Sequence, residues 1–247
     1  MIKNSQEIKI MIEAGKKLAQ VKKIIYDMID VNISLLELDK KAYDEIIKLD
    51  CKPSFLGYQD YPNTACISVN NQLIHGIPTD YKIQDGDIVS VDLGLIYKGF
   101  HSDSAFTKGV GNISDNDKKV IEVAEESFYA GVDAIKPGAR TGDIGYAISQ
   151  VIKKNNMFTP HDFSGHGIGK SLHEDPVVNN HGVRGTGTLL KDGMVICIEP
   201  MILQKSEEII WDQDGWTIWS EDGKNASHYE HTIAIIDGKP KILTEGI

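Results

Sequence analysis

Four acidic residues stand inside or at the ends of apolar, strand-forming runs of this 247-residue chain. They are Asp92, Asp103, Glu199 and Glu230. Taken singly, each acid is best interpreted as a residue at the end of a strand that is solvated or paired with a lysine. Carboxylates are seldom tolerated together in apolar surroundings, because a buried charge without a partner is costly. The four acids therefore predict a common site in which they share protons or hold cations.

The charge of the acids indicates which partner they need. Four carboxylates carry four negative charges that two divalent cations would balance, and His166 can add a neutral nitrogen ligand. Oxygen-rich ligation with one imidazole suits Mn, Fe, Co or Zn, and paired ions about 3.5–4 Å apart commonly activate a bridging water. A lysine or arginine could neutralise the acids instead, but no basic residue lies in the apolar runs that carry them.

The first two acids lie in the stretch 85–107, DGDIVSVDLGLIYKGFHSDSAFT, which predicts a β-hairpin. Strand-forming residues flank a short reversal at 97–99, where glycine can take a positive φ. With 97–98 as a two-residue loop, we expect Asp92 opposite Asp103, to within one position. Their Cβ atoms would then lie about 5 Å apart on one face of the hairpin.

Helical patterns precede both groups of acids. Apolar residues at helical spacing predict one helix over 8–29 and a second from a capping box at Ser34 to Leu49. The same pattern predicts helices over 115–135 and 141–154. The order of helix, helix and strands therefore occurs twice.

Three pairs of similar segments are separated by nearly the same number of residues, which indicates a duplicated chain. They are DGDIVSVD (85–92) with DGMVICIE (192–199) at an offset of 107, and Leu38 with Ile144 and His75-Gly76 with His181-Gly182 at an offset of 106. Asp92 and Glu199 would then occupy equivalent strand positions across a pseudo-twofold axis. The second half carries an insertion-like stretch, 205–225, rich in Trp, Asp and Gly. Because no linker separates the halves, roughly 1–110 and 111–247, we expect one catalytic domain.

The overall composition excludes several classes of partner. An apolar content of 41% can form a large core, and a formal charge of −10 argues against general binding to nucleic acid or anionic membranes. Cys51, Cys66 and Cys197 form no CxxC pair, which suits a reducing compartment. No apolar run approaches the roughly 20 residues that cross a bilayer. We expect a cytoplasmic monomer that binds neither DNA nor membranes.

Two histidines lie in a glycine-rich stretch, His166 within GHGIG (165–169) and His173 seven residues later. A regular strand would send them to opposite faces, so both reach one site only if the glycines supply a bend. By itself this motif favours a structural loop over a ligand loop. Five other histidines are interpreted as loop residues bonded to the backbone: His75, His101, His161, His181 and His228. His231, next to Glu230, is expected to point to the opposite face of its strand.

Taken in order, the motifs resemble the methionine aminopeptidases, in particular the short type I form. They are HGIP (75–78), DGDIVSVDLG (85–94), FHSDSAFT (100–107), GHGIGKSLHE (165–174), MVICIEPM (194–201) and YEHT (229–232). The resemblance implies the pita-bread fold, an α/β (α+β) arrangement of two pseudo-symmetric helix-helix-strand halves around a central antiparallel sheet. It also implies that Asp92 chelates one metal while Asp103 and Glu230 bridge both. His166 and Glu199 would complete the second metal site.

The resemblance further implies removal of the N-terminal methionine from nascent proteins and peptides with a small second residue. A hydroxide bridging two metals would attack the first carbonyl while Glu199 moves the proton to the leaving nitrogen. His173 would donate to the developing oxyanion, and His75 would contact the scissile amide nitrogen. The implied methionine pocket is lined by Tyr58, Tyr61, Cys66 and Trp216, with Leu172 and Ile74 where bacterial members often carry phenylalanine and cysteine.

Two alternatives remain at the level of the sequence. An Xaa-Pro dipeptidase or creatinase relative usually carries a large additional N-terminal domain, whereas this chain begins with its first helix. A non-catalytic peptide-binding relative would be expected to lack metal ligands, and all five are present. The ribosome is a candidate partner of such an enzyme, but the insertion offers RNA mainly acids: Glu207, Glu208, Asp212 and Asp214.

Overall fold

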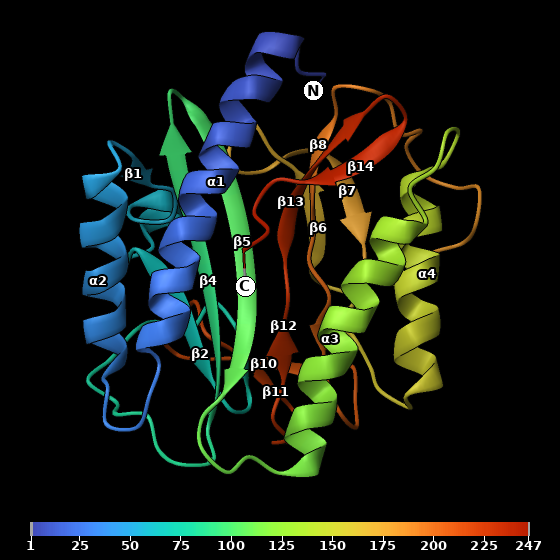
Figure 1. The fold of residues 1–247 in the computed structure, drawn as a ribbon. Coiled ribbons are helices and arrows are strands. Elements are labelled where there is room, and N and C mark those ends of the chain that lie inside the picture. Colours follow the sequence, from blue (N-terminus) through green and yellow to red (C-terminus); the bar gives the residue numbers. More distant parts are fainter. Residues whose placement is uncertain (1, 247) are drawn as a thin grey trace.

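The structure is a computed structural model that describes residues 2–246, and its helices cover one face of a set of antiparallel strands (Figure 1). All four predicted helices are present, with ends close to those expected. They are α1 (Ser5–Met28), α2 (Leu35–Lys48), α3 (Asp115–Asp133) and α4 (Thr141–Lys154). Capping boxes at Asn4 and Ser34 begin the first two helices, because each side chain accepts a backbone N–H of the first turn.

The strands form two larger sheets and two small ones. The first larger sheet contains β1 (Lys52–Pro53), β2 (Ala65–Val69), β4 (Ile88–Tyr97) and β5 (Phe100–Gly109). The second has the order β14 (Lys239–Ile242), β13 (His231–Ile236), β8 (Val195–Ile198), β6 (Ser164–Gly167) and β7 (Glu174–Asn179). The insertion-like stretch forms β10 (Ile209–Trp211) and β11 (Ile218–Ser220), which pair with β3 (Gln72–Ile74), while β9 (Met201–Ile202) pairs with β12 (Ser227–His228).

The hairpin of β4 and β5 is present, but its register differs from the prediction. Its loop is Lys98-Gly99, both with positive φ, so Asp92 lies opposite Ala105 and Asp103 lies opposite Gly94. Asp92 is therefore not opposite Asp103, and the predicted pairing is wrong by two positions. A left-handed backbone at Lys98 is not expected from its residue type, because lysine carries a Cβ and rarely adopts positive φ. Since side chains alternate with a period of two, the two carboxylates still share one face.

The two larger sheets meet where β5 passes the residues before β13. The backbones of Ala105 and Glu230 exchange both hydrogen bonds, at 3.2 and 3.0 Å. The hydroxyl of Thr232 accepts from the N–H of Asp103 at 2.9 Å and donates to its carbonyl at 2.8 Å. The run 226–236 does not form one continuous strand, because the chain leaves β12 and bonds to the first sheet at Glu230 before β13 begins.

Each helix pair packs over its own apolar cluster. The helices α1 and α2 bury Leu18, Ile25 and Leu38 against β4 and neighbouring strands. The helices α3 and α4 bury Phe128 and Ile148 against strands of the second larger sheet. This division agrees with the predicted helix-helix-strand repeat. Among residues 2–246, no helix combines the length and apolar character needed to cross a membrane.

The Thr232 bonds predict a measurable contribution to stability. Thr232→Val keeps the shape of the side chain but leaves the buried N–H and carbonyl of Asp103 without that partner. We expect the free energy of unfolding to fall by about 2 kcal/mol or more, measured by urea denaturation. Thr188→Val, at an exposed position, is the control. If Thr232→Val lowers the free energy of unfolding no more than Thr188→Val does, the hydrogen bonds of Thr232 to Asp103 do not stabilise the fold.

Candidate active site and metal centre

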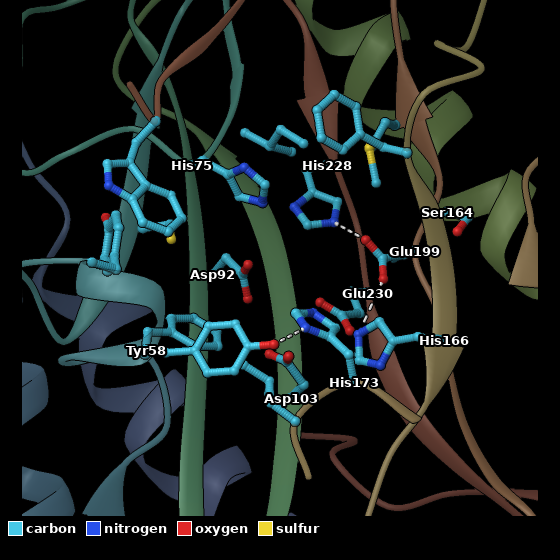
Figure 2. A pocket seen from close by; sticks show the side chains of 18 of the residues that line it. Tyr58, His75, Asp92, Asp103, Ser164, His166, His173, Glu199, His228 and Glu230 are labelled. Atoms are coloured by element: carbon cyan, nitrogen blue, oxygen red, sulfur yellow. Dashed lines mark hydrogen bonds and ion pairs between the residues drawn. The ribbon is translucent and has the colours of Figure 1, made fainter. Parts of the chain in front are cut away.

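One cavity of about 240 Å³ opens between the two larger sheets. All thirteen residues singled out from the sequence as site residues line it, together with six that were not. The five expected metal ligands come from separate elements: Asp92 from β4, Asp103 from β5, His166 from β6, Glu199 after β8 and Glu230 before β13. Figure 2 shows their side chains pointing toward one another across the cavity.

The carboxylates lie close enough to share an ion. Ligand atoms of Asp92, Asp103 and Glu230 all lie within 4.8 Å of one another. Glu199 lies beside them, with one carboxylate oxygen 3.4 Å from Nε2 of His166. Asp103 and Glu230 are almost fully buried, whereas Asp92 and Glu199 are partly open to the cavity. Acids from both parts of the chain therefore meet at one point.

Burial and mutual repulsion disfavour the charged form of these acids. Burial raises the pKa of Asp92 to about 7. Burial, and next the neighbouring carboxylates, raise the pKa values of Asp103, Glu199 and Glu230 well above their usual range. Burial lowers the pKa of His166 to about 3, so its imidazole is neutral at pH 7 and can serve as a ligand.

Three oxygens in the cluster lack a hydrogen-bond partner within residues 2–246. They are Oδ1 of Asp92, Oδ1 of Asp103 and Oε1 of Glu230. Buried polar atoms are normally satisfied, so unpaired carboxylate oxygens that converge on one point fit a cation. Together with the neutral imidazole of His166, this donor set suits divalent metal ions.

Two glycines let His166 reach the cluster. A Cβ at Gly165 would lie 2.3 Å from the carbonyl oxygen of Cys197, and one at Gly167 would lie 2.1 Å from that of Asp175. The ladder between β6 and β7 shifts register between the same two glycines. The predicted bend is present, and His173 returns to the cavity with its ring 4.4 Å from that of His166.

His173 and His75 lie on the open side of the carboxylates. Nδ1 of His173 lies 2.7 Å from the hydroxyl of Tyr58 (Figure 2). His75 is nearly buried against the cluster, and burial, followed by the neighbouring His173, lowers its pKa to about 4. Burial also lowers the pKa of His173. Both side chains are therefore neutral near pH 7.

An apolar recess adjoins the two histidines. Tyr61 is buried, and its hydroxyl lies 3.0 Å from the carbonyls of Ala65 and Gly76. Its ring meets that of Trp216 edge-on at a centroid distance of 5.0 Å. The remaining predicted pocket residues line the same cavity: Tyr58, Cys66, Leu172 and Ile74.

Comparison with known proteins identifies the family. The model of metallopeptidase family M24 matches residues 9–237. A methionine aminopeptidase from Clostridium perfringens is 45% identical over 244 residues, 99% of this chain and 98% of that protein. The chain belongs to metallopeptidase family M24.

Solved structures agree with this assignment. The methionine aminopeptidase from Rickettsia prowazekii has a TM-score of 0.97 at 33% identity, with 99% of each chain covered. A prolidase from Pyrococcus furiosus has a TM-score of 0.79 at 25% identity and covers all of this chain, but the match spans 66% of the prolidase. The predicted pita-bread fold and the resemblance to methionine aminopeptidases are confirmed.

His228, which was expected to be an ordinary loop histidine, lies in the M24 site. It is buried on β12, with Nε2 3.8 Å from a carboxylate oxygen of Glu199. Burial lowers its pKa to about 3. A signal was available, because His228 precedes Glu230 by two residues and strand alternation places such a pair on one face. Phe55, Gln59, Phe163, Ser164 and Met201 also line the cavity without having been predicted.

A buried lysine lies behind the acids, although none was expected near them. Lys22 of α1 is fully buried, with Nζ 2.9 Å from the hydroxyl of Ser104 and 3.4 Å from Nδ1 of His231. Burial lowers its pKa to about 7. The expectation considered only the strands, whereas this lysine comes from a helix packed on their far side. One ammonium group still cannot balance four carboxylates.

Cys197 is the other unpredicted group beside the acids. Its sulfur lies within 4.8 Å of ligand atoms of His166 and Glu230. Burial, then the negative charge of nearby Glu230, raise the pKa of this thiol well above its usual range. The thiol is therefore protonated and adds no charge to the cluster. His101, His161 and His181 do not line the cavity.

The raised carboxyl pKa values predict that metal binding releases protons. Divalent ions bind carboxylates, so the protons held by the acids at neutral pH must leave, and affinity should rise as pH rises through about 7. His166 is already neutral there and releases none. Calorimetric titration in buffers of different ionisation enthalpy would count the protons. Metal affinity that stays constant between about pH 6 and about pH 8 would contradict the raised pKa values.

Proposed function

We propose that this M24 metallopeptidase removes the N-terminal methionine from nascent proteins and from peptides with a small second residue. The observation that carries the proposal is a cluster of four carboxylates and an imidazole that opens directly onto an apolar recess. The cluster is suited to metal ions, and the recess to one apolar side chain. The relatives named methionine aminopeptidase match over nearly their whole length, which supports the same activity here.

The five residues would hold two divalent ions from among Mn, Fe, Co and Zn. Asp92 would bind one ion, Asp103 and Glu230 would bridge the two, and His166 with Glu199 would complete the second site. Such ions would polarise the substrate carbonyl and activate a water molecule for attack. The balance of four negative and four positive charges supports two ions.

Glu199 is placed to move a proton. Its carboxylate is partly open to the cavity, so it can reach a water molecule there. The buried His166 and His228 flank its two oxygens at 3.4 and 3.8 Å. We infer that Glu199 takes a proton from the attacking water and delivers it to the leaving amide nitrogen.

The two neutral histidines would orient the scissile amide. If the hydroxyl of Tyr58 donates to Nδ1 of His173, Nε2 of His173 carries the hydrogen and can donate to the carbonyl oxygen as it gains charge. His75 would contact the amide nitrogen. Its Nδ1 is buried and has no hydrogen-bond partner within residues 2–246, so no such bond to Nδ1 fixes the orientation of the ring.

The recess would accept the methionine side chain. An unbranched thioether adapts to an irregular apolar wall, and the recess is lined by Tyr58, Tyr61, Cys66, Trp216, Leu172 and Ile74. Beyond it, the rings of His75 and Phe163 lie 5.7 Å apart and narrow the space for the second residue. This restriction supports a preference for small side chains at that position.

The proposed partners are the N-termini of nascent chains in the cytoplasm. All five proposed ligands come from one chain, so a monomer suffices. The acidic residues of the 205–225 stretch argue against docking on ribosomal RNA.

We expect the protein to release methionine from Met-Gly and Met-Ala peptides. A chelator should abolish the release, and Mn, Co or Fe should restore it, because the carboxylate cluster is inactive without cations. Free methionine can be measured by coupled oxidation. Absence of turnover with every metal would contradict an enzymatic role, and turnover restricted to Xaa-Pro substrates would point to a dipeptidase.

Asp103→Asn tests the bridging role. The substitution keeps the size of the side chain but removes one charge and one ligand oxygen, so it should weaken metal binding at least about tenfold and lower kcat. Metal content after dialysis, measured by elemental analysis, reports the first effect. Asp80→Asn, at an exposed position, is the matched control. Full metal loading of Asp103→Asn would rule out a bridging carboxylate at this position.

A further inference from the structure

Apolar side chains continue from the cavity wall onto the outer strand β10. Trp211 is 56% exposed there, which is unusual for so large a ring. In the small sheet, Trp211 lies opposite Ile218, and Ile218 lies opposite Ile74. Residues directly opposite one another in antiparallel strands face the same side. Trp211 therefore shares a face with Ile74, which lines the cavity.

A series of aromatic rings links Trp211 to the site of chemistry. The ring of Trp211 lies 5.9 Å from that of Phe163, and Phe163 lies 5.7 Å from His75. Phe163 lines the cavity. His75 also lies 6.4 Å from Trp216, which belongs to the proposed methionine recess. Phe163 and Trp211 thus continue the series from His75 through residues that are not part of that recess.

We propose that Trp211 forms a subsite for the third residue of the peptide substrate and favours an apolar or aromatic side chain there. This inference rests on the proposed aminopeptidase function. An extended peptide advances about 3.3–3.6 Å per residue. The scissile nitrogen belongs to the second residue, so with that nitrogen at His75 the third residue lies one step further outward. A long apolar or aromatic side chain there can reach the indole of Trp211.

The energetic reason is the exposure of the indole. An apolar or aromatic side chain that covers the half-exposed indole removes apolar surface from water and adds a ring contact. These two gains correspond to a KM that is roughly three- to tenfold lower. A glycine at the third position offers neither contact. The preference should act mainly through KM, because Trp211 lies outside the groups proposed to touch the scissile bond.

The test compares three substrates, Met-Ala, Met-Ala-Gly and Met-Ala-Phe, with the metal-loaded protein. The original chain should show a KM for Met-Ala-Phe roughly three- to tenfold lower than for Met-Ala-Gly. Trp211→Ala should bring the two tripeptides to equal KM and leave Met-Ala turnover unchanged. Ile210→Ala is the matched control, because Ile210 is 50% exposed on the same strand but faces the other side.

Each remaining outcome overturns the inference. Equal KM values for the two tripeptides in the original chain would exclude the subsite. So would a ratio of the two KM values that is the same in Trp211→Ala as in the original chain. In both cases turnover of Met-Ala would still support the aminopeptidase function. If Trp211→Ala lowers turnover equally for all three substrates, the residue has a structural role only. Absence of Met-Ala turnover in the original chain would remove the proposed function, and the subsite with it.

Discussion

The repulsion among four buried carboxylates is the constraint on which the site depends. Asp92, Asp103, Glu199 and Glu230 are held at one point by strands that come from both parts of the chain. Without metal, burial disfavours the charged form of all four acids, and repulsion from neighbouring carboxylates adds to it for Asp103, Glu199 and Glu230, so their pKa values rise and the acids keep protons. Divalent cations relieve the repulsion more completely, because they replace the protons with fixed positive charge.

Such a cluster needs a rigid scaffold behind it. Thr232 clamps the backbone of Asp103, and Ser104 donates its hydroxyl to the carbonyl of Glu230 at 2.7 Å. Lys22 reaches the same hydroxyl from α1, so a helix is tied directly to the strands that carry two of the acids. These contacts fix the backbone, which leaves the carboxylates free to bind ligands.

Much of the fold was predictable because it depends on local sequence. Helical periodicity and capping residues located all four helices, and strand alternation placed Asp92 and Asp103 on one face. The hairpin register was not predictable, since it depends on the left-handed backbone of Lys98. His228 was missed although it stands two residues from Glu230. Lys22 could not be found, because it approaches the strands only through the packing of α1.

The site residues, like the fold, were predictable only in part. The five expected ligands and the pocket residues all line one cavity, since ordered motifs carry information about residues far apart in the chain. The contact between Trp211 and Phe163 could not be predicted from local sequence, because Trp211 lies on β10 and Phe163 directly precedes β6, which belongs to a different sheet.

The chemistry proposed for this site depends on whether the carboxylates and His166 hold two divalent ions. Anomalous diffraction from crystals soaked in manganese tests it most directly. We predict two peaks, one beside Asp92 and one beside His166, with Asp103 and Glu230 between them. A single peak, or none within this cluster, would contradict the account.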